Sequence, residues 1–276
     1  MSLATIIECA IKNQNKYNYP LEDFYVLPNQ SINWLLKTYT TASKHTKIKS
    51  SLFAGGVLYA GIIKSLYSID AKAIDINPFS ITGQAYAIYL FNNYPRKTIE
   101  KALLIDKKGI FLSYSKEEFN EAANIFNEFT TTYTKLESSS LFKELFIVRE
   151  RDGKYMKYTN PLINSCLVKT LSKNNIIPSF PEISYGNFLD IKETYDFIST
   201  NSIINKTALP KEKFVSNSLN LLNEGGILEI TPVINDICTS NAKLILKSTT
   251  KTILSSERGC WGMKTHYYLL QKKENP

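Results

Sequence analysis

The stretch that decides the fold is residues 51–78, SLFAGGVLYAGIIKSLYSIDAKAIDINP. A short apolar run ends in Gly55 and Gly56, helix-like sequence follows, and a second apolar run leads to Asp75. Glycine lets the backbone turn sharply and approach a ligand closely, and a helix that follows the turn presents free N–H groups. Asp75 lies nineteen residues after Gly56, near the roughly 20 residues after which an acidic side chain binds ribose in nucleotide-binding folds. The stretch therefore predicts a nucleotide-type cofactor site.

Later segments continue an alternation of strands and helices. Residues 182–185 and 195–200 are short apolar runs that end in polar turn residues, and residues 227–231 form another run after two glycines. Such alternation predicts an α/β fold, in which a mostly parallel sheet has helices on both faces. Ligands bind these sheets beyond the carboxyl ends of the strands, so the loops after the strands are where we expect a site.

Apolar periodicity predicts helices over 3–15, 21–42 and 211–223. A further helix is expected to run from an N-cap at Ser80 to about residue 91, and Gly225 and Gly226 are expected to end the helix over 211–223. The remaining C-terminal sequence predicts strands without long helices between them.

The middle of the chain breaks the alternation. Residues 93–175 are polar and mostly helical in pattern, which predicts a helical insertion or lid. The expected domains are then an N-terminal helical segment over 1–48 and a cofactor-binding domain made of 49–92 and 176–276.

Composition narrows the class of protein. The chain has 276 residues, 43% of them apolar, and a net charge of +8. This charge is compatible with a nucleic-acid partner, with an acidic membrane surface, or simply with solubility. Its four cysteines form no CxxC pair, so we expect a reducing compartment and no metal site. Apolar stretches fall well short of the roughly 20 residues of a membrane helix, and residues 1–20 lack signal-peptide features. A cytoplasmic protein is expected.

Three further segments, together with the glycine stretch, carry a family resemblance. They are ISYGNFLDI (183–191), YDFISTNSII (195–204) and LLNEGGILEI (221–230), in that order. Over about 50–92 and 182–270 the chain resembles the Rossmann-like (class I) S-adenosylmethionine-dependent methyltransferase superfamily. The resemblance implies a Rossmann-like α/β fold, to which the residue pattern outside the matched segments adds N-terminal helices and a helical insertion. It also implies S-adenosylmethionine as cofactor and methyl transfer to a small molecule.

The resemblance also assigns residues to the two ends of the cofactor. Ala54, Gly55 and Gly56 would line the methionine end. Asp75 would bind the ribose, since a carboxylate can accept hydrogen bonds from both hydroxyls. Ile76 would pack beside the adenine.

Two later groups of residues complete the implied site. Asn187 and Phe188 would read the adenine edge and cover its face. Ser199, Thr200 and Asn201 would close over the sulfonium and meet the substrate. The resemblance names no catalytic base, and neither histidine of the chain stands in a position that suggests one.

The sequence departs from the family pattern at several places. Phe53 and Ala54 precede the glycines where an acidic residue is common, and Asn187 replaces a common aspartate. The motif after the fourth strand is TNSI at 200–203 rather than NPPY, which argues against base or amide methylation. Two alternatives stay open: transfer of the aminocarboxypropyl group from the same cofactor, and a Rossmann-like binding protein without catalytic activity.

Overall fold

The protein is described by a computed structural model that covers residues 1–13, 32–106, 111–136, 138–146, 148–158, 161–200, 210–233, 242–256 and 259–273. The chain divides into two compact units. The first combines Met1–Asn29 with Asn77–Tyr185, and the second combines Gln30–Ile76 with Gly186–Pro276. The domain boundaries expected from the sequence remain a prediction.

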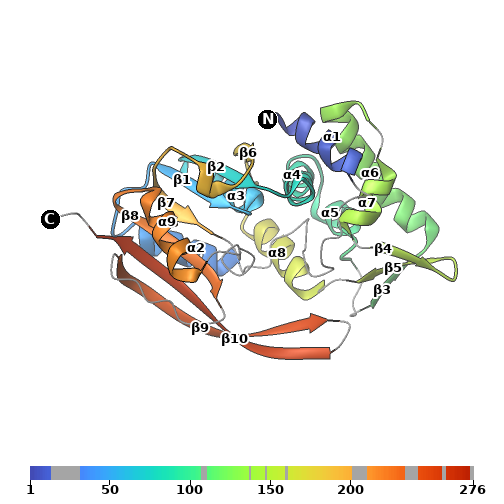
Figure 1. Ribbon diagram of the computed structural model, residues 1–276. Helices are drawn as coiled ribbons and strands as arrows, with labels where there is room; N and C mark the ends of the chain where they lie inside the picture. The colour runs from blue at the N-terminus through green and yellow to red at the C-terminus, as the bar shows by residue number, and fades with distance from the viewer. Residues whose placement is uncertain are drawn as a thin grey trace. The chain divides into compact units, whose positions relative to one another are not determined.

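A seven-stranded sheet organises the fold (Figure 1). Its order is β6-β2-β1-β7-β8-β10-β9. The strands, in chain order, are β1 (Ser50–Ala54), β2 (Asp70–Asp75), β6 (Glu182–Tyr185), β7 (Tyr195–Ser199), β8 (Leu222–Val233), β9 (Ala242–Ser256) and β10 (Gly259–Lys272). β1 is parallel to β2 and β7, β7 is parallel to β8, and β10 is antiparallel to β8 and β9. The first five positions give the 3-2-1-4-5 order of a doubly wound sheet, so the expected Rossmann-like α/β fold is confirmed.

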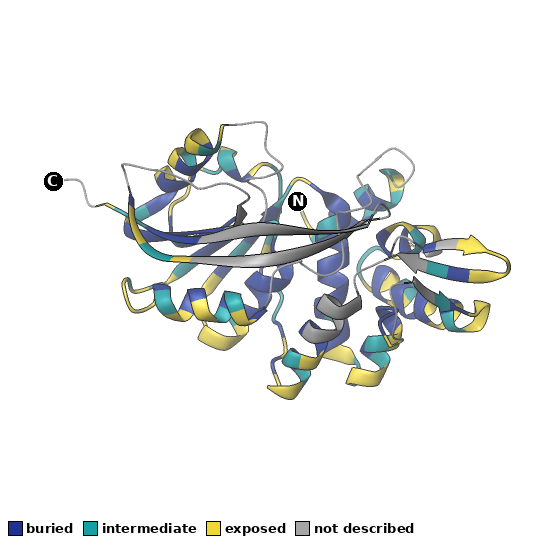
Figure 2. Ribbon diagram, turned by 90° about the horizontal axis from the view of Figure 1, so that it is seen from below, coloured by how far each residue is buried: buried dark blue, intermediate teal, exposed yellow. Residues whose placement is uncertain are grey.

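Helices cover both faces of this sheet in the second unit. They are α2 (Ile32–Ala42), α3 (Val57–Tyr67) and α9 (Lys211–Asn220), with the short 3-10 helix η1 (Phe188–Asp190). On one face Leu52 and Leu228 share a core cluster with Phe214 of α9. On the other face Tyr39 of α2 packs against Phe197 of β7, with ring centroids 5.3 Å apart. Successive strand residues point to opposite faces. Because both faces are covered, β1 and β7 contain consecutive apolar residues (LFA at 52–54 and FI at 197–198) and are largely buried (Figure 2).

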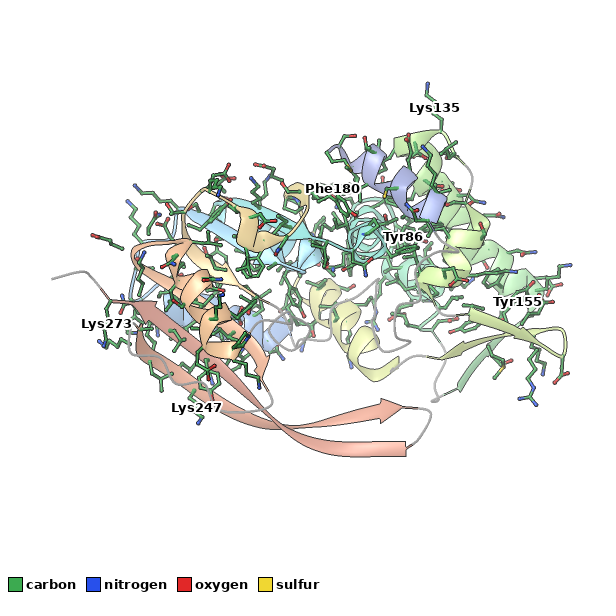
Figure 3. The ribbon with its side chains drawn as sticks, in the orientation of Figure 1. Tyr86, Lys135, Tyr155, Phe180, Lys247 and Lys273 are labelled. Atoms are coloured by element: carbon green, nitrogen blue, oxygen red, sulfur yellow. The ribbon has the colours of Figure 1, made fainter. Side chains whose placement is uncertain are left out.

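The first unit is mainly helical. Its helices are α1 (Leu3–Asn13), α4 (Pro78–Asn93), α5 (Arg96–Ala102), α6 (Lys116–Thr134), α7 (Ser139–Leu145) and α8 (Pro161–Lys173). Aromatic rings form much of its core. The ring centroid of Tyr86 in α4 lies 4.9 Å from that of Phe126 and 5.3 Å from that of Phe129, both in α6. Figure 3 shows Tyr86 within this group of helices.

The expected helical insertion also contains a small sheet that the sequence reasoning missed. β3 (Phe111–Tyr114), β5 (Lys154–Tyr158) and β4 (Val148–Arg151) pair antiparallel in that order. β4 and β5 are joined by Asp152 and Gly153, which have φ of 52° and 70°. Two consecutive positive φ values are typical of the type I′ hairpin turn, for which Asp-Gly is a preferred pair. The hairpin is therefore built into the local sequence.

Several expected helix ends are corrected. Asn77, not Ser80, is the N-cap of α4, and its Oδ1 accepts hydrogen bonds from the main-chain N–H groups of Phe79 (2.9 Å) and Ser80 (3.4 Å). α9 ends at Asn220, and Gly225, with φ of 68°, lies inside β8 rather than after a helix. The register of β8 against β7 shifts at this place, because the left-handed glycine forms an irregularity in the strand. The part of the expected helix over 21–42 that precedes residue 32 lies outside the described residues.

The long antiparallel pair β9–β10 forms one edge of the sheet. These are the strands expected from the C-terminal sequence. Lys247 of β9, labelled in Figure 3, has its Nζ 5.6 Å from the ring centroid of Tyr268 in β10. Lysines on an outer strand discourage further strand pairing.

Within the described residues, no helix is both long and apolar enough to cross a membrane.

Candidate functional site

The candidate site lies at the carboxyl ends of β1, β2 and β7. β1 has β2 on one side and β7 on the other, so the chain leaves the centre of the sheet in opposite directions at this point. Ala54 is in register with Ile74, and Phe53 with Ser199. The carboxyl ends of these strands therefore lie at the same edge of the sheet. This switch point is where ligands bind in doubly wound folds.

The turn after β1 depends on Gly55. Its φ is 74°, a left-handed value that favours glycine. Its N–H donates a hydrogen bond to the Ile74 carbonyl (2.8 Å), which ties the turn to β2. Gly56, the N-cap of α3, has φ of −127°, and a β-carbon there would lie 3.5 Å from that of Phe53. Of the two glycines, only Gly55 is required by backbone conformation.

Ala54 has a different place from the glycines that follow it. Its side chain is fully buried and belongs to the core cluster on the α9 face. Only the main chain of Ala54 is therefore available to line the site.

Asp75 and Ile76 end β2 at the same edge. Asp75 is half-buried, and its carbonyl accepts a hydrogen bond from the N–H of Gly186 (3.0 Å). Ile76 is 63% exposed, although Ala73 and Ile74 of the strand before it are buried. A carboxylate beside an exposed apolar side chain can accept hydrogen bonds from hydroxyls while presenting a surface for a flat apolar group.

Asn187 and Phe188 lie after β6 with unequal exposure. Asn187 is exposed, and its side-chain oxygen accepts a hydrogen bond from the N–H of Leu189 (3.2 Å), which caps η1. Phe188 is only 4% exposed, and its ring centroid lies 5.4 Å from that of Phe214 in α9. The ring of Phe188 is thus part of the core, and its role over an adenine face stays a prediction.

Ser199 and Thr200, at the end of β7, are fully buried. The main-chain N–H and the Oγ1 of Thr200 both donate to the carbonyl of Glu229, at 3.1 Å and 3.2 Å. The Oγ of Ser199 has no hydrogen-bond partner among the described residues. Asn201 and the rest of the TNSI motif lie outside them. The described end of β7 is therefore held firmly and does not face solvent.

Sequence reasoning missed Glu229. This residue of β8 is fully buried, and its Oε1 accepts a hydrogen bond from Thr38 Oγ1 of α2 (3.0 Å). The available signal was one charged residue within the apolar run ILEI at 227–230. Buried charged residues need partners, but a sequence does not tell which distant residue supplies one.

A second polar cluster lies at the opposite end of β7. The Asp196 carboxylate accepts hydrogen bonds from the N–H groups of Lys49 (2.8 Å) and Ser50 (3.1 Å) and from the side-chain amide of Asn223 (2.7 Å). Burial alone would raise the pKa of Asp196, but these hydrogen bonds outweigh it and lower the pKa. Because the cluster joins the amino ends of strands, its role is structural.

The remaining polar candidates do not join the site. His45 lies exposed in the turn after α2, and His266 lies in β10, where its side chain is outside the described part of the structure. No group of three or more His, Cys, Asp or Glu side chains that could hold a metal ion occurs among the described residues.

Comparisons with known proteins give similarities in fold only. No family model matches the chain, and no curated protein matches it. The structure is similar to TehB from Haemophilus influenzae, with a TM-score of 0.42 and 13% identity over 95% of this chain and 66% of that one. It is also similar to the N-methyltransferase NodS from Bradyrhizobium japonicum, solved with S-adenosyl-L-homocysteine. That similarity has a TM-score of 0.42 and 9% identity over 99% of this chain and 100% of that one.

A third similar structure is the rRNA methyltransferase aviRa from Streptomyces viridochromogenes, with a TM-score of 0.41 and 12% identity over 89% of this chain and 86% of that one. At such scores and identities these similarities carry no functional argument. The class of fold rests instead on the strand order and directions of this chain, and the function rests on the edge of the sheet described above.

Proposed function

We propose that the protein is an S-adenosylmethionine-dependent transferase of the Rossmann-like methyltransferase superfamily, and that it methylates a small molecule. One relationship carries the proposal: the left-handed turn at Gly55 and the carboxylate-bearing end of β2 at Asp75 lie side by side at the switch point of the sheet. This pairing of a close-approach turn with an acidic strand end suits a nucleoside linked to a polar chain.

The described residues fit such a cofactor. The turn at Gly55, which has no β-carbon, lets a ligand approach the backbone closely just before α3 begins. Asp75 would accept hydrogen bonds from the ribose, and the exposed side chain of Ile76 would pack on the adenine. Asn187, exposed at the start of η1, would meet the edge of the base.

S-adenosylmethionine, when bound, supplies an activated methyl group on a sulfonium. The tasks of the protein are then to orient the acceptor and to exclude water. The two hydrogen bonds from Thr200 to the Glu229 carbonyl fix the end of β7, which pairs with β1 just before Gly55. A fixed strand end can hold an acceptor molecule in one orientation. We assign no catalytic base, because Asp75 is the only titratable side chain among the cofactor-binding residues expected from the sequence, and it is assigned to the ribose.

Calorimetric titration with S-adenosylmethionine and S-adenosylhomocysteine tests the proposal. Asp75→Ala should weaken binding by more than tenfold, about 1.4 kcal/mol. Asp70→Ala is the matched control, because Asp70 is the exposed first residue of the same strand at its far end. Its affinity should equal that of the wild type. No binding by the wild type at millimolar ligand would contradict the proposal and leave a binding protein of unknown ligand.

The product distinguishes two transfer reactions at the same site. Incubation with a mixture of acceptor molecules should release S-adenosylhomocysteine if the methyl group moves. Methylthioadenosine would instead show aminocarboxypropyl transfer. An RNA acceptor, suggested only by the net charge of +8, would require RNA binding that weakens steeply with salt.

A further inference from the structure

Glu229 occupies a place in which an apolar residue would be expected. β8 pairs with β7 on one side and with β10 on the other, and Glu229 is in register with Ser199 and Leu269. Its side chain is fully buried. Burying a carboxylate is costly even when it has hydrogen-bond partners, and apolar residues of similar size often give equal or greater stability. Packing alone therefore does not account for a glutamate here.

The side chain of Glu229 joins the sheet to α2. Its Oε1 accepts a hydrogen bond from Thr38 Oγ1 at 3.0 Å, and Thr38 is also fully buried. The same hydroxyl lies 3.1 Å from the carbonyl of Trp34 and 3.0 Å from that of Leu35. It carries only one hydrogen, so a bond to the helix carbonyls would satisfy it locally. The bond to Glu229 is the one that fixes the helix to the sheet.

The main chain of Glu229 contacts a second residue, Thr200. Its carbonyl accepts hydrogen bonds from both the N–H and the Oγ1 of Thr200. Thr200 is the first residue after β7 and belongs to the candidate site. One residue thus contacts both α2 and the end of β7.

The direction of α2 brings its first turns to the candidate site. Tyr39 packs on Phe197, and Thr38 contacts Glu229, which is in register with Ser199, two residues further along β7. The helix therefore runs antiparallel to β7, so that residues before Thr38 lie nearer the carboxyl edge of the sheet. Trp34, one turn earlier, therefore lies nearer that edge than Thr38 does.

We propose that Glu229 is a positioning residue of the candidate site. Its side chain fixes α2 through Thr38, its main chain fixes Thr200, and the two contacts hold α2 in place relative to the carboxyl end of β7. This inference rests on the proposed function, because its consequence is tighter binding of the nucleoside cofactor at an edge that is already arranged.

Four variants separate positioning from packing. Glu229→Gln keeps an oxygen acceptor for Thr38, whereas Glu229→Val removes it and fills the space with apolar atoms. Thr38→Val removes the donor with little change in shape. The double variant Thr38→Val/Glu229→Val completes a cycle that isolates the coupling between the two side chains.

The measurements are affinity for S-adenosylmethionine by calorimetry, thermal unfolding, and hydrogen exchange of the α2 amides. Glu229→Val should weaken binding at least fivefold and speed exchange in α2, while its unfolding temperature stays equal to the wild type or rises. Glu229→Gln should bind within twofold of the wild type. The double variant should bind no more weakly than Glu229→Val alone, because both changes break the same contact.

The outcomes separate the two proposals. If the wild type binds and Glu229→Val binds equally well with slow exchange in α2, Glu229 is a packing residue and this inference is wrong. A loss of affinity that follows only from unfolding would overturn it in the same way. If Glu229→Val does not fold, the affinity of Thr38→Val for S-adenosylmethionine and the rate of hydrogen exchange in its α2 decide the question in its place. If the wild type itself does not bind, the proposed function fails and this inference fails with it.

Discussion

The carboxylate of Asp196 in β7 accepts a hydrogen bond from the main-chain N–H of Lys49, 2.8 Å away, just before β1 begins. This contact, with those from Ser50 and Asn223, fastens the amino ends of three strand segments. It lies at the opposite end of β7 from the candidate site. Stability and binding can therefore be tested separately along one strand.

Asp196→Asn should destabilise the protein in a manner that depends on pH. Hydrogen bonds to a charged group contribute about 1.5–3 kcal/mol, so a loss of about 2 kcal/mol is expected at pH 7. The pKa of Asp196 is lowered in the folded protein, so its contribution is full above the unfolded value of about 3.9. It is lost as pH falls through the lower folded pKa.

Urea unfolding of the wild type and Asp196→Asn between pH 7 and pH 3 checks this dependence. The difference in free energy of unfolding should shrink towards the acid end. A difference that stays constant over the whole range would show that the charge of Asp196 contributes nothing. Asp70→Ala, at an exposed carboxylate, should show little difference at any pH.

Gly55→Ala should lower the free energy of unfolding, whereas Gly56→Ala should leave it nearly unchanged. A β-carbon in the left-handed region costs about 1–2 kcal/mol, partly offset by the stiffer unfolded chain, so we expect a net loss of about 1 kcal/mol for Gly55→Ala. Gly56 has negative φ, and a β-carbon there would make contacts of 3.5–3.6 Å. Equilibrium unfolding of both variants should show Gly56→Ala within about 0.5 kcal/mol of the wild type. Equal losses at the two positions would count against this account of the turn.

Ile76→Ala should weaken cofactor binding without affecting stability. Its side chain is 63% exposed, so little apolar contact within the protein is lost. If the side chain packs on an adenine, removing three carbon atoms should cost roughly 1 kcal/mol of binding, about fivefold in Kd. Calorimetry against Ile177→Ala, a similarly exposed isoleucine (54%) of the other unit, supplies the comparison. Unchanged affinity in both variants would remove Ile76 from the site.

Phe188→Ala should behave as a core substitution. The ring is 4% exposed and packs against Phe214, so its removal should cost about 3–5 kcal/mol of stability. Phe188→Leu should cost less, because most of the volume is kept. The two unfolding curves should be measured beside cofactor affinity at a temperature where both variants are folded. A Phe188→Ala variant of normal stability that has lost affinity would place the ring at the cofactor instead.

The alternation of strands and helices could be read from the sequence because each central strand is a short apolar run followed by turn residues. Gly55 and Asp75 were placed correctly at strand ends for the same reason. The hairpin at Asp152 and Gly153 was missed because its strands are rich in lysine, arginine and glutamate, which obscures the apolar alternation of an antiparallel sheet.

The orientation of site residues was less accessible than their position. Ser199 and Phe188 occur in the expected order along the chain, yet both side chains are buried, and Phe188 packs against Phe214 of α9. The bond between Thr38 and Glu229 joins residues 191 positions apart. Such a pair is defined by tertiary packing, and no local pattern indicates it.

The place of β10 between β8 and β9 has a consequence for how the chain folds. β9 precedes β10 in the chain but reaches the sheet only through it. During synthesis, β9 therefore has no partner in the sheet until β10 has emerged. Hairpins form within microseconds, whereas pairing between distant segments is slow. The two strands should accordingly pair with each other first and dock onto β8 as a unit, which makes completion of the sheet a late, single event.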